Sequence, residues 1–336
     1  MNASDLTAGL NFVRGAGRMF GAPTELAGHV KAAPHLEWSC DGSRLLSGSD
    51  DRSVLVWDVS GRGAQVGSLQ HHARVDALAL APHSPHLLVS CADKKCCVWD
   101  LRSKDCPISV FTVSTTSDVL NCAWHTGGNL VTTGNKDDVL AVADLRKSRV
   151  VKRTKFAFEV NEFRFAEGGS RIVASAGPKD GAGSLAVLAL GEGEVGGGGW
   201  SLSTVANLVA HTSSALCVAL SPDERRLALG AADSLVSLWS TRNMVSVGCV
   251  GRLEAAVHSV SISHDSQWVA SAPKSPLVDI SDAATGAHAE TLALRAGSAA
   301  CVRFHPTSPL LAYSTSDKPA SARDACVFVR SMSPSS

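Results

Sequence analysis

Histidine, aspartate and tryptophan recur at a constant spacing in three places along the 336-residue chain. In each set the histidine lies 28 residues and the aspartate six residues before the tryptophan: His29, Asp51 and Trp57; His71, Asp93 and Trp99; His211, Asp233 and Trp239. A histidine beside a carboxylate could act as a general base, but nucleophilic catalysis also needs a nucleophile within hydrogen-bond reach. The pair recurs without a nucleophile beside it, so we interpret all three sets as structural.

A second candidate site is a basic segment. Six of the ten residues from 146 to 155 are Lys or Arg, although the chain carries 31 basic and 31 acidic residues and no net charge. Such a segment could bind phosphates or an acidic protein partner, or it could be a solvated outer strand whose charges discourage edge pairing. Because the chain has a single tyrosine, base stacking is disfavoured, and any RNA contact should be weak and non-specific. The candidate contacts are Arg146, Lys147, Arg149, Lys152, Arg153 and Lys155.

The segment Asn135-Lys136-Asp137-Asp138 is expected to form a turn between two strands. Asp137 has the same place in its repeat as Asp51, which indicates a structural role. Lys136 and Asp138 are left as possible contacts with a partner or RNA. A calcium site is not expected here, because the other oxygen ligands of a calcium-binding loop are missing.

Trp99-Asp100-Leu101-Arg102 resembles the WDxR box by which propeller proteins dock on cullin-ring ubiquitin ligases as substrate receptors. Asp144-Leu145-Arg146 repeats the box without its tryptophan. The box is short and also occurs in propellers that bind no ligase. It supplies the alternative function for this chain, a substrate receptor.

Motifs for metal, phosphate and membrane binding are missing from the sequence. The ten cysteines include no CxxC pair and no histidine at zinc-ligand spacing, so reduced thiols and no metal or cofactor are expected. The glycine-rich segment 191–199 lacks the GK[ST] ending of a phosphate loop and is interpreted as a surface loop between blades 4 and 5. No run approaches the roughly 20 apolar residues of a membrane span. The chain is therefore not expected to be an enzyme or a membrane protein.

The elements that position these residues come from an internal repeat. The segment ending at Trp57-Asp58 returns at Trp99-Asp100 and at Trp239-Ser240 and, in degenerate form, four more times; successive copies are 42, 44, 45, 51, 42 and 49 residues apart. That is the period of WD repeats, in which each unit forms one four-stranded blade. Seven apolar pairs spaced two residues apart mark the inner strands: Leu36/Trp38, Leu78/Leu80, Cys122/Trp124, Phe163/Phe165, Val218/Leu220, Val260/Ile262 and Val302/Phe304. The sequence predicts an all-β, seven-bladed WD-repeat β-propeller, closed as a single domain.

The two ends of the repeat region indicate how the ring closes. Residues 20–330 should form the propeller, with residues 20–28 as the outer strand of the last blade, because the residues after Arg330 are too few to supply it. Residues 1–19 are expected to be a flexible lead and residues 331–336 a tail. Residues 316–324 are expected to lengthen the last turn of blade 7.

Several strings lie outside the WD consensus, and they resemble the THO complex subunit 3 family. They begin at Gly134, Lys155, Gly230, Val257, Val278 and Phe304, and the resemblance covers roughly residues 24–330. It implies a nuclear, non-catalytic subunit of the THO assembly that acts in messenger-RNA packaging and export coupled to transcription. The implied partners are other THO subunits, chiefly the large helical scaffold subunit, with export factors contacted indirectly.

Overall fold

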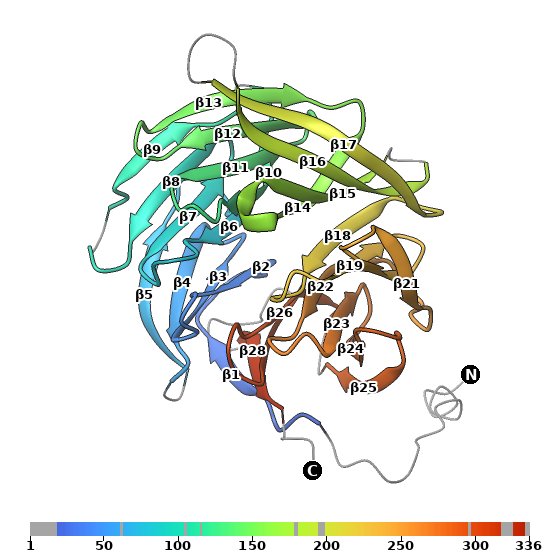
Figure 1. The fold of residues 1–336 in the computed structure, drawn as a ribbon. Coiled ribbons are helices and arrows are strands. Elements are labelled where there is room, and N and C mark those ends of the chain that lie inside the picture. Colours follow the sequence, from blue (N-terminus) through green and yellow to red (C-terminus); the bar gives the residue numbers. More distant parts are fainter. Residues whose placement is uncertain are drawn as a thin grey trace.

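The computed structural model describes residues 19–332 except 61–62, 104–105, 115, 178–180, 194–198, 295–296 and 317–324. These residues form seven antiparallel sheets of four strands each, arranged like blades around a central axis (Figure 1). The prediction of an all-β, seven-bladed propeller is confirmed. Most of the predicted lead, residues 1–18, lies outside the described residues, as do residues 317–324 and 333–336.

Six blades use four consecutive strands, ordered from the axis to the rim. Blades 1 and 2 contain β2 (His35–Trp38), β3 (Arg44–Gly48), β4 (Ser53–Asp58), β5 (Ala64–Gln70), β6 (Ala77–Leu80), β7 (Leu87–Ala92), β8 (Lys95–Asp100) and β9 (Ser109–Thr112). Blades 3 and 4 contain β10 (Val119–Trp124), β11 (Leu130–Asn135), β12 (Val139–Asp144), β13 (Arg149–Lys155), β14 (Glu159–Ala166), β15 (Arg171–Gly177), β16 (Gly183–Gly193) and β17 (Gly199–His211).

Blades 5 and 6 contain β18 (Ala215–Leu220), β19 (Arg226–Ala231), β20 (Val236–Ser240), β21 (Val245–Val250), β22 (Val257–Ile262), β23 (Trp268–Pro273), β24 (Leu277–Asp282) and β25 (His288–Ala293). Blade 7 combines β26 (Ala299–Phe304), β27 (Leu310–Thr315) and β28 (Ala325–Ser331) with β1 (Thr24–Ala27). A 3₁₀ turn, η2 (Glu167–Gly169), joins β14 to β15. Among the described residues no helix is long and apolar enough to cross a membrane.

The core lies between neighbouring blades. Strands β2, β6, β10, β14, β18, β22 and β26 contact one another in a closed ring around the axis. All seven apolar pairs predicted from period 2 lie on these strands. Phe163, for example, is fully buried in the cluster between blades 3 and 4. Alternation therefore buries one side of each inner strand and directs the residues between the apolar pairs the other way.

Blade 7 joins the two ends of the described chain. β1 pairs antiparallel with β28, with Thr24 opposite Val329, and Leu26 on β1 is buried in the core between blades 7 and 1. An isolated bridge between Phe20 and Met332 extends the pairing. β28 ends at Ser331, one residue past the predicted end of the propeller. The closing strand β1 covers residues 24–27, which is shorter than the predicted 20–28.

The inner turns of blades 7 and 1 are also linked. His305 Nε2–H donates to the carbonyl oxygen of Gly42 at 3.0 Å, and Trp38 Nε1–H donates to the carbonyl oxygen of Arg303 at 3.1 Å. Gly42 has a positive φ of 72°, and a Cβ there would lie 2.1 Å from the His305 ring. Glycine is required at this position for both its backbone conformation and its small size.

The glycine-rich segment 191–199 is placed differently from the prediction. Its two ends belong to β16 and β17, the third and outer strands of blade 4, and they pair as far as Gly193 opposite Gly199. The interpretation as a connection between blades 4 and 5 was wrong, because the segment lies within the outer hairpin of blade 4. This ribbon is longer than the outer hairpins of the neighbouring blades (Figure 1).

Candidate functional site

The structure brings the His/Asp/Trp residues of blades 1 and 5 together. In blade 1, His29 Nδ1 lies 2.9 Å from Asp51 Oδ2, and a carboxylate only accepts, so Nδ1 carries the proton. His29 Nε2 then accepts from Ser47 Oγ at 2.7 Å, while Ser47 accepts from Trp57 Nε1–H at 2.8 Å. Hydrogen bonding to the charged form holds the pKa of Asp51 below its ordinary value, although burial alone would raise it. The chain of bonds ties the loop before β2 to β3, the β3–β4 turn and β4, and each of these polar groups is engaged in a structural hydrogen bond.

The serine in this chain of bonds lies on a different strand in blade 5 than in blade 1. In blade 5, His211 pairs with Asp233 at 3.1 Å, and its Nε2 and the Trp239 indole both bind the hydroxyl of Ser237 at 2.8 Å. In blade 1 the paired positions are Ser47 and Leu55; in blade 5 they are Leu229 and Ser237. Directly opposite residues share a face of the sheet, so a hydroxyl from either strand reaches the same place. The sequence analysis did not detect this serine, because its spacing from the tryptophan differs between the two blades.

Blade 2 lacks the expected bond between His71 and Asp93. Ser90 Oγ accepts from Trp99 Nε1–H at 2.7 Å and contacts His71 Nε2 at 3.1 Å, but His71 Nδ1 is buried without a hydrogen-bond partner. The hairpin is one residue shorter than in blade 1: Leu88 pairs with Trp99, eleven residues on, whereas Leu45 pairs with Trp57, twelve residues on. The equal spacing of aspartate before tryptophan hid this difference.

In the shorter hairpin of blade 2, the side chain of Asp93 does not bind His71. Asp93 occupies the turn itself with a positive φ of 58°, and its backbone N–H donates to Asp76 Oδ2 at 3.2 Å. In blades 1 and 5 the residue after the aspartate, Arg52 or Ser234, has the positive φ instead. In the second set, histidine, serine and tryptophan are therefore in contact, and the aspartate binds elsewhere.

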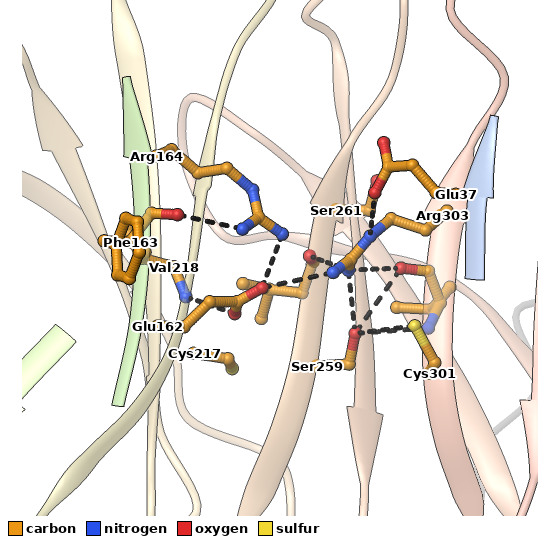
Figure 2. A network of polar contacts seen from close by, with 12 residues as sticks. Glu37, Glu162, Phe163, Arg164, Cys217, Val218, Ser259, Ser261, Cys301 and Arg303 are labelled. Atoms are coloured by element: carbon orange, nitrogen blue, oxygen red, sulfur yellow. Dashed lines mark hydrogen bonds and ion pairs between the residues drawn. The ribbon is translucent and has the colours of Figure 1, made fainter. Parts of the chain in front are cut away.

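Charged side chains from opposite sides of the ring meet on the propeller axis (Figure 2). They are Glu37 of β2, Glu162 and Arg164 of β14, and Arg303 of β26. The sequence analysis missed this central-channel network. A signal was available: Glu37, Arg164 and Arg303 are the middle residues of three predicted apolar pairs, where the other inner strands have Ala or Ser. A charge at such a position lies on the side of the strand opposite to its two apolar neighbours.

Glu162 is the centre of the network. Its Oε1 accepts from Arg303 Nη2 at 3.1 Å and from Arg164 Nη2 at 2.5 Å, and its Oε2 accepts from the backbone N–H of Val218 at 3.0 Å (Figure 2). Arg303 also donates to Ser259 Oγ at 3.1 Å. Blades 4 and 7 are not neighbours in the ring. The Glu162–Arg303 ion pair therefore crosses the central channel and links its two sides.

The ionisation of these groups follows from burial and charge. Burial would raise the pKa of Glu162, but the guanidinium groups of Arg164 and Arg303 hold it below its ordinary value. Burial raises the pKa of Glu37. The positive charge of Arg303 offsets this only in part, because Glu37 Oε2 lies 3.9 Å from Arg303 Nε. Glu162 is therefore held in its ionised form and is not suited to proton transfer.

A cavity of about 170 Å³ adjoins the network, and residues from all seven blades line it, including His35 and His258. Sites that enclose a ligand are usually about 300–1,000 Å³. The cavity is smaller than that range, and its charged groups already bind one another. No cluster of His, Cys, Asp or Glu within the described residues could hold a metal ion.

The pKa of His35 makes a prediction about acid stability. Burial, and then the positive charge of Arg303, lower it to about 4. An unfolded histidine titrates near pH 6.5, so between pH 6.5 and 4 the unfolded chain binds the extra proton and the folded state loses stability as pH falls. We expect His35→Gln to flatten the fall of the thermal midpoint across this window, measured by circular dichroism at half-unit steps. An identical fall in variant and wild type would contradict the assignment.

The basic segment lies at the rim. Arg149, Lys152, Arg153 and Lys155 are on β13, the outer strand of blade 3, whereas Arg146 and Lys147 are in the preceding turn. Both turn residues bind buried Asp144: Arg146 Nη2 lies at 3.0 Å and Lys147 Nζ at 4.0 Å from its Oδ2.

The turn from Asn135 to Asp138 is distant from the channel network, at the end of blade 3 where β11 meets β12. Lys136 forms an exposed ion pair with Asp118, and Asp138 adopts a positive φ of 61° within the turn. Asp137 accepts a hydrogen bond from Thr116 instead of a histidine. Neither Lys136 nor Asp138 lines the cavity at the propeller axis.

The WDxR box ends in a turn whose aspartate and arginine form an ion pair with each other. Arg102 binds Asp100 through two nitrogens, Nε to Oδ1 at 2.9 Å and Nη2 to Oδ2 at 2.6 Å, and its side chain is 66% exposed. Trp99 of the box is buried in the core between blades 1 and 2. Arg146 and Asp144 repeat the paired arrangement in blade 3.

Comparison with known proteins places the chain in a family. The model of the family described as "WD domain, G-beta repeat" matches residues 23–58, 63–100 and 202–240. "THO complex subunit 3" of Arabidopsis thaliana is 32% identical over 299 residues, which cover 88% of this chain and 90% of that protein. The chain belongs to the THO complex subunit 3 family. The family resemblance noted in the sequence is confirmed.

Other matches agree with the propeller fold of this THO complex subunit 3 family member. The "WD repeat-containing protein AAC3" of Dictyostelium discoideum is 24% identical over 313 residues, or 86% of this chain and 63% of that protein. The solved structure of U3-55K superposes with a TM-score of 0.75 at 18% identity and covers 92% of this chain and 98% of that one. The three WD matches include the strands that carry Trp57, Trp99 and Trp239.

Proposed function

We propose that this protein is a non-catalytic docking subunit of a THO complex, which acts in the nucleus in messenger-RNA packaging and export coupled to transcription. The similarity to THO complex subunit 3 carries the proposal, because it extends over nine-tenths of that protein rather than over a single repeat. Propellers share a fold and little function, so WD repeats alone would not support it. Its main partner would be the large helical scaffold subunit, with export factors contacted indirectly.

The geometry of the described residues supports docking rather than catalysis. The charged groups of the channel pair with one another, the adjoining cavity is small, and the histidine–aspartate pairs are linked into chains of structural hydrogen bonds. The surface that remains available to a partner is the outside of the closed ring of blades. Such a surface suits a subunit that binds other proteins.

The experiment is affinity purification of the tagged chain from nuclear extract, followed by gel filtration at 0.3 M salt. We expect co-elution with the large helical THO subunit, because an interface with an apolar centre is little screened by salt. Elution alone would contradict the proposal. Recovery with a cullin-ring ligase adaptor would instead favour the substrate-receptor alternative, in which the exposed Arg102 would take part.

RNA binding by the isolated protein is expected to stay in the non-specific range, with a Kd no tighter than ~10⁻⁴–10⁻⁶ M at physiological salt. The reason is that the chain has no net charge, its basic residues gather only in the segment from 146 to 155, and stacking aromatics are scarce. Fluorescence anisotropy with labelled single strands at several salt concentrations measures this. Nanomolar, sequence-selective binding would make the protein a primary RNA reader.

A further inference from the structure

The seven outermost strands differ sharply in charge. β1, β5, β9, β17, β21 and β25 contain no Lys or Arg, and all four basic residues of the outermost strands lie on β13. β13 and β17 contact each other and run side by side along the rim of blades 3 and 4 (Figure 1). A single basic strand on a rim whose other outermost strands carry no Lys or Arg requires a local explanation.

The positive charges on the side of β13 that faces blade 4 are not neutralised by the fold. Arg149 and Lys152 pair with Asp144 and Val142 of β12, on the side of the core between blades 3 and 4. Neither Arg149 nor Lys152 has an ion pair or hydrogen bond to another side chain in the described part of the chain, since Asp144 is taken by Arg146 and Lys147. On the other side, Arg153 donates to the carbonyl oxygen of Val113.

The facing side of β17 is uncharged and partly apolar. Asn207 and Val209 pair with Ala186 and Ser184, and Ala186 belongs to the core between blades 3 and 4, so both residues face β13. Val209 is 76% exposed, more than any other large apolar residue described, and Val205, at a bulge in the same strand, is 52% exposed. Exposed valines on the strand that contacts a strand of unpaired cations make a mixed apolar and basic surface, of the kind that a protein partner can cover.

We propose that the blade 3–4 rim, defined as Arg149, Lys152, Val205 and Val209, docks a segment of a protein partner that carries Asp or Glu beside apolar side chains. Carboxylates would pair with Arg149 and Lys152, and apolar side chains would cover Val205 and Val209. This inference rests on the proposed docking function and names its surface. A protein fits better than RNA, because the valines offer nothing to phosphate and Trp200, the aromatic residue of β17, packs against the core.

The test uses the full chain in the co-elution experiment with two separate variants, Val209→Glu and Lys152→Glu. We expect each to reduce the amount of co-eluting partner at least tenfold, because each places a negative charge against an acidic segment. Val247→Glu on β21 is the matched control, since Val247 is 50% exposed on an outer strand that has no basic residue. It should recover partner within twofold of wild type. Circular dichroism verifies that all three variants fold.

A zero-length carbodiimide cross-linker supplies an independent readout, because it joins a lysine amine only to a carboxylate in direct contact. Mass spectrometry of the cross-linked complex should find Lys152 joined to an Asp or Glu of the partner. If wild type co-elutes and both rim variants co-elute equally, the rim proposal is wrong while the docking function stands. If wild type itself elutes alone, both are wrong. Loss of RNA binding with an intact protein complex would assign the strand to RNA and overturn the inference.

Discussion

Arg303→Met is expected to lower the free energy of unfolding by roughly 3 kcal/mol, near the lower end of the range for breaking a buried ion pair. The substitution removes the cation that crosses the channel and leaves Glu162 with Arg164 and the Val218 N–H. The side chains of Arg303 and Glu162 are 17% and 14% exposed, so solvent relieves part of the cost. Equilibrium urea denaturation followed by tryptophan fluorescence measures the change.

A double-mutant cycle separates the ion pair from the rest of each side chain. Glu162→Gln combined with Arg303→Met should cost clearly less than the sum of the two single changes, because the two groups share one interaction. The control is Arg102→Met, which removes an exposed ion pair with Asp100 and should change the free energy of unfolding far less. Equal effects of Arg303→Met and Arg102→Met would show that the channel network contributes nothing special.

Trp57→Ala should cost about 3–5 kcal/mol, the usual result of removing a large buried side chain. Trp57 is 1% exposed in the core between blades 7 and 1, and its indole N–H binds Ser47. The loss is a large part of the total stability of a typical domain, about 5–15 kcal/mol, so the yield of soluble protein should fall as well. Because blade 1 adjoins the closure of the ring, unfolding should become less cooperative.

The matched variant is Trp57→Phe, which keeps most of the apolar volume and loses only the bond to Ser47. We expect it to cost about 1–2 kcal/mol, since one buried hydroxyl is left without its donor. Asp100→Ala, in the exposed turn of blade 2, should cost less than either. A Trp57→Ala protein that unfolds at the wild-type urea concentration would contradict the placement of this residue in the core.

The ring of inner strands could be predicted from the sequence because the signal is local. An apolar pair such as Leu36/Trp38 with a turn after it specifies a buried strand whatever surrounds it, and seven pairs at the repeat interval specify seven blades. The closure by β1 followed from counting strands. These inferences need no knowledge of distant contacts.

The channel network could not be predicted in the same way. Glu162 and Arg303 are 141 residues apart, and only the closed ring brings them together. The shorter hairpin at Asp93 and the serine that changes strand at Ser237 depend on strand register. A spacing from tryptophan does not reveal register, because one residue more or less in a turn moves every later side chain.

The pairing of β1 with β28 sets an order of assembly during synthesis. The first strand of the propeller leaves the ribosome before any other strand and acquires its partner only when the last strand has been made. Until then Leu26 has no core to enter, and blade 1 lacks the neighbour that covers its other face. Contacts of such long sequence separation form slowly, and unpaired strand edges invite association with other chains. The same β1–β28 pairing that closes the finished ring therefore leaves the unfinished chain with exposed strand edges, which must be kept from other chains until β28 has been made.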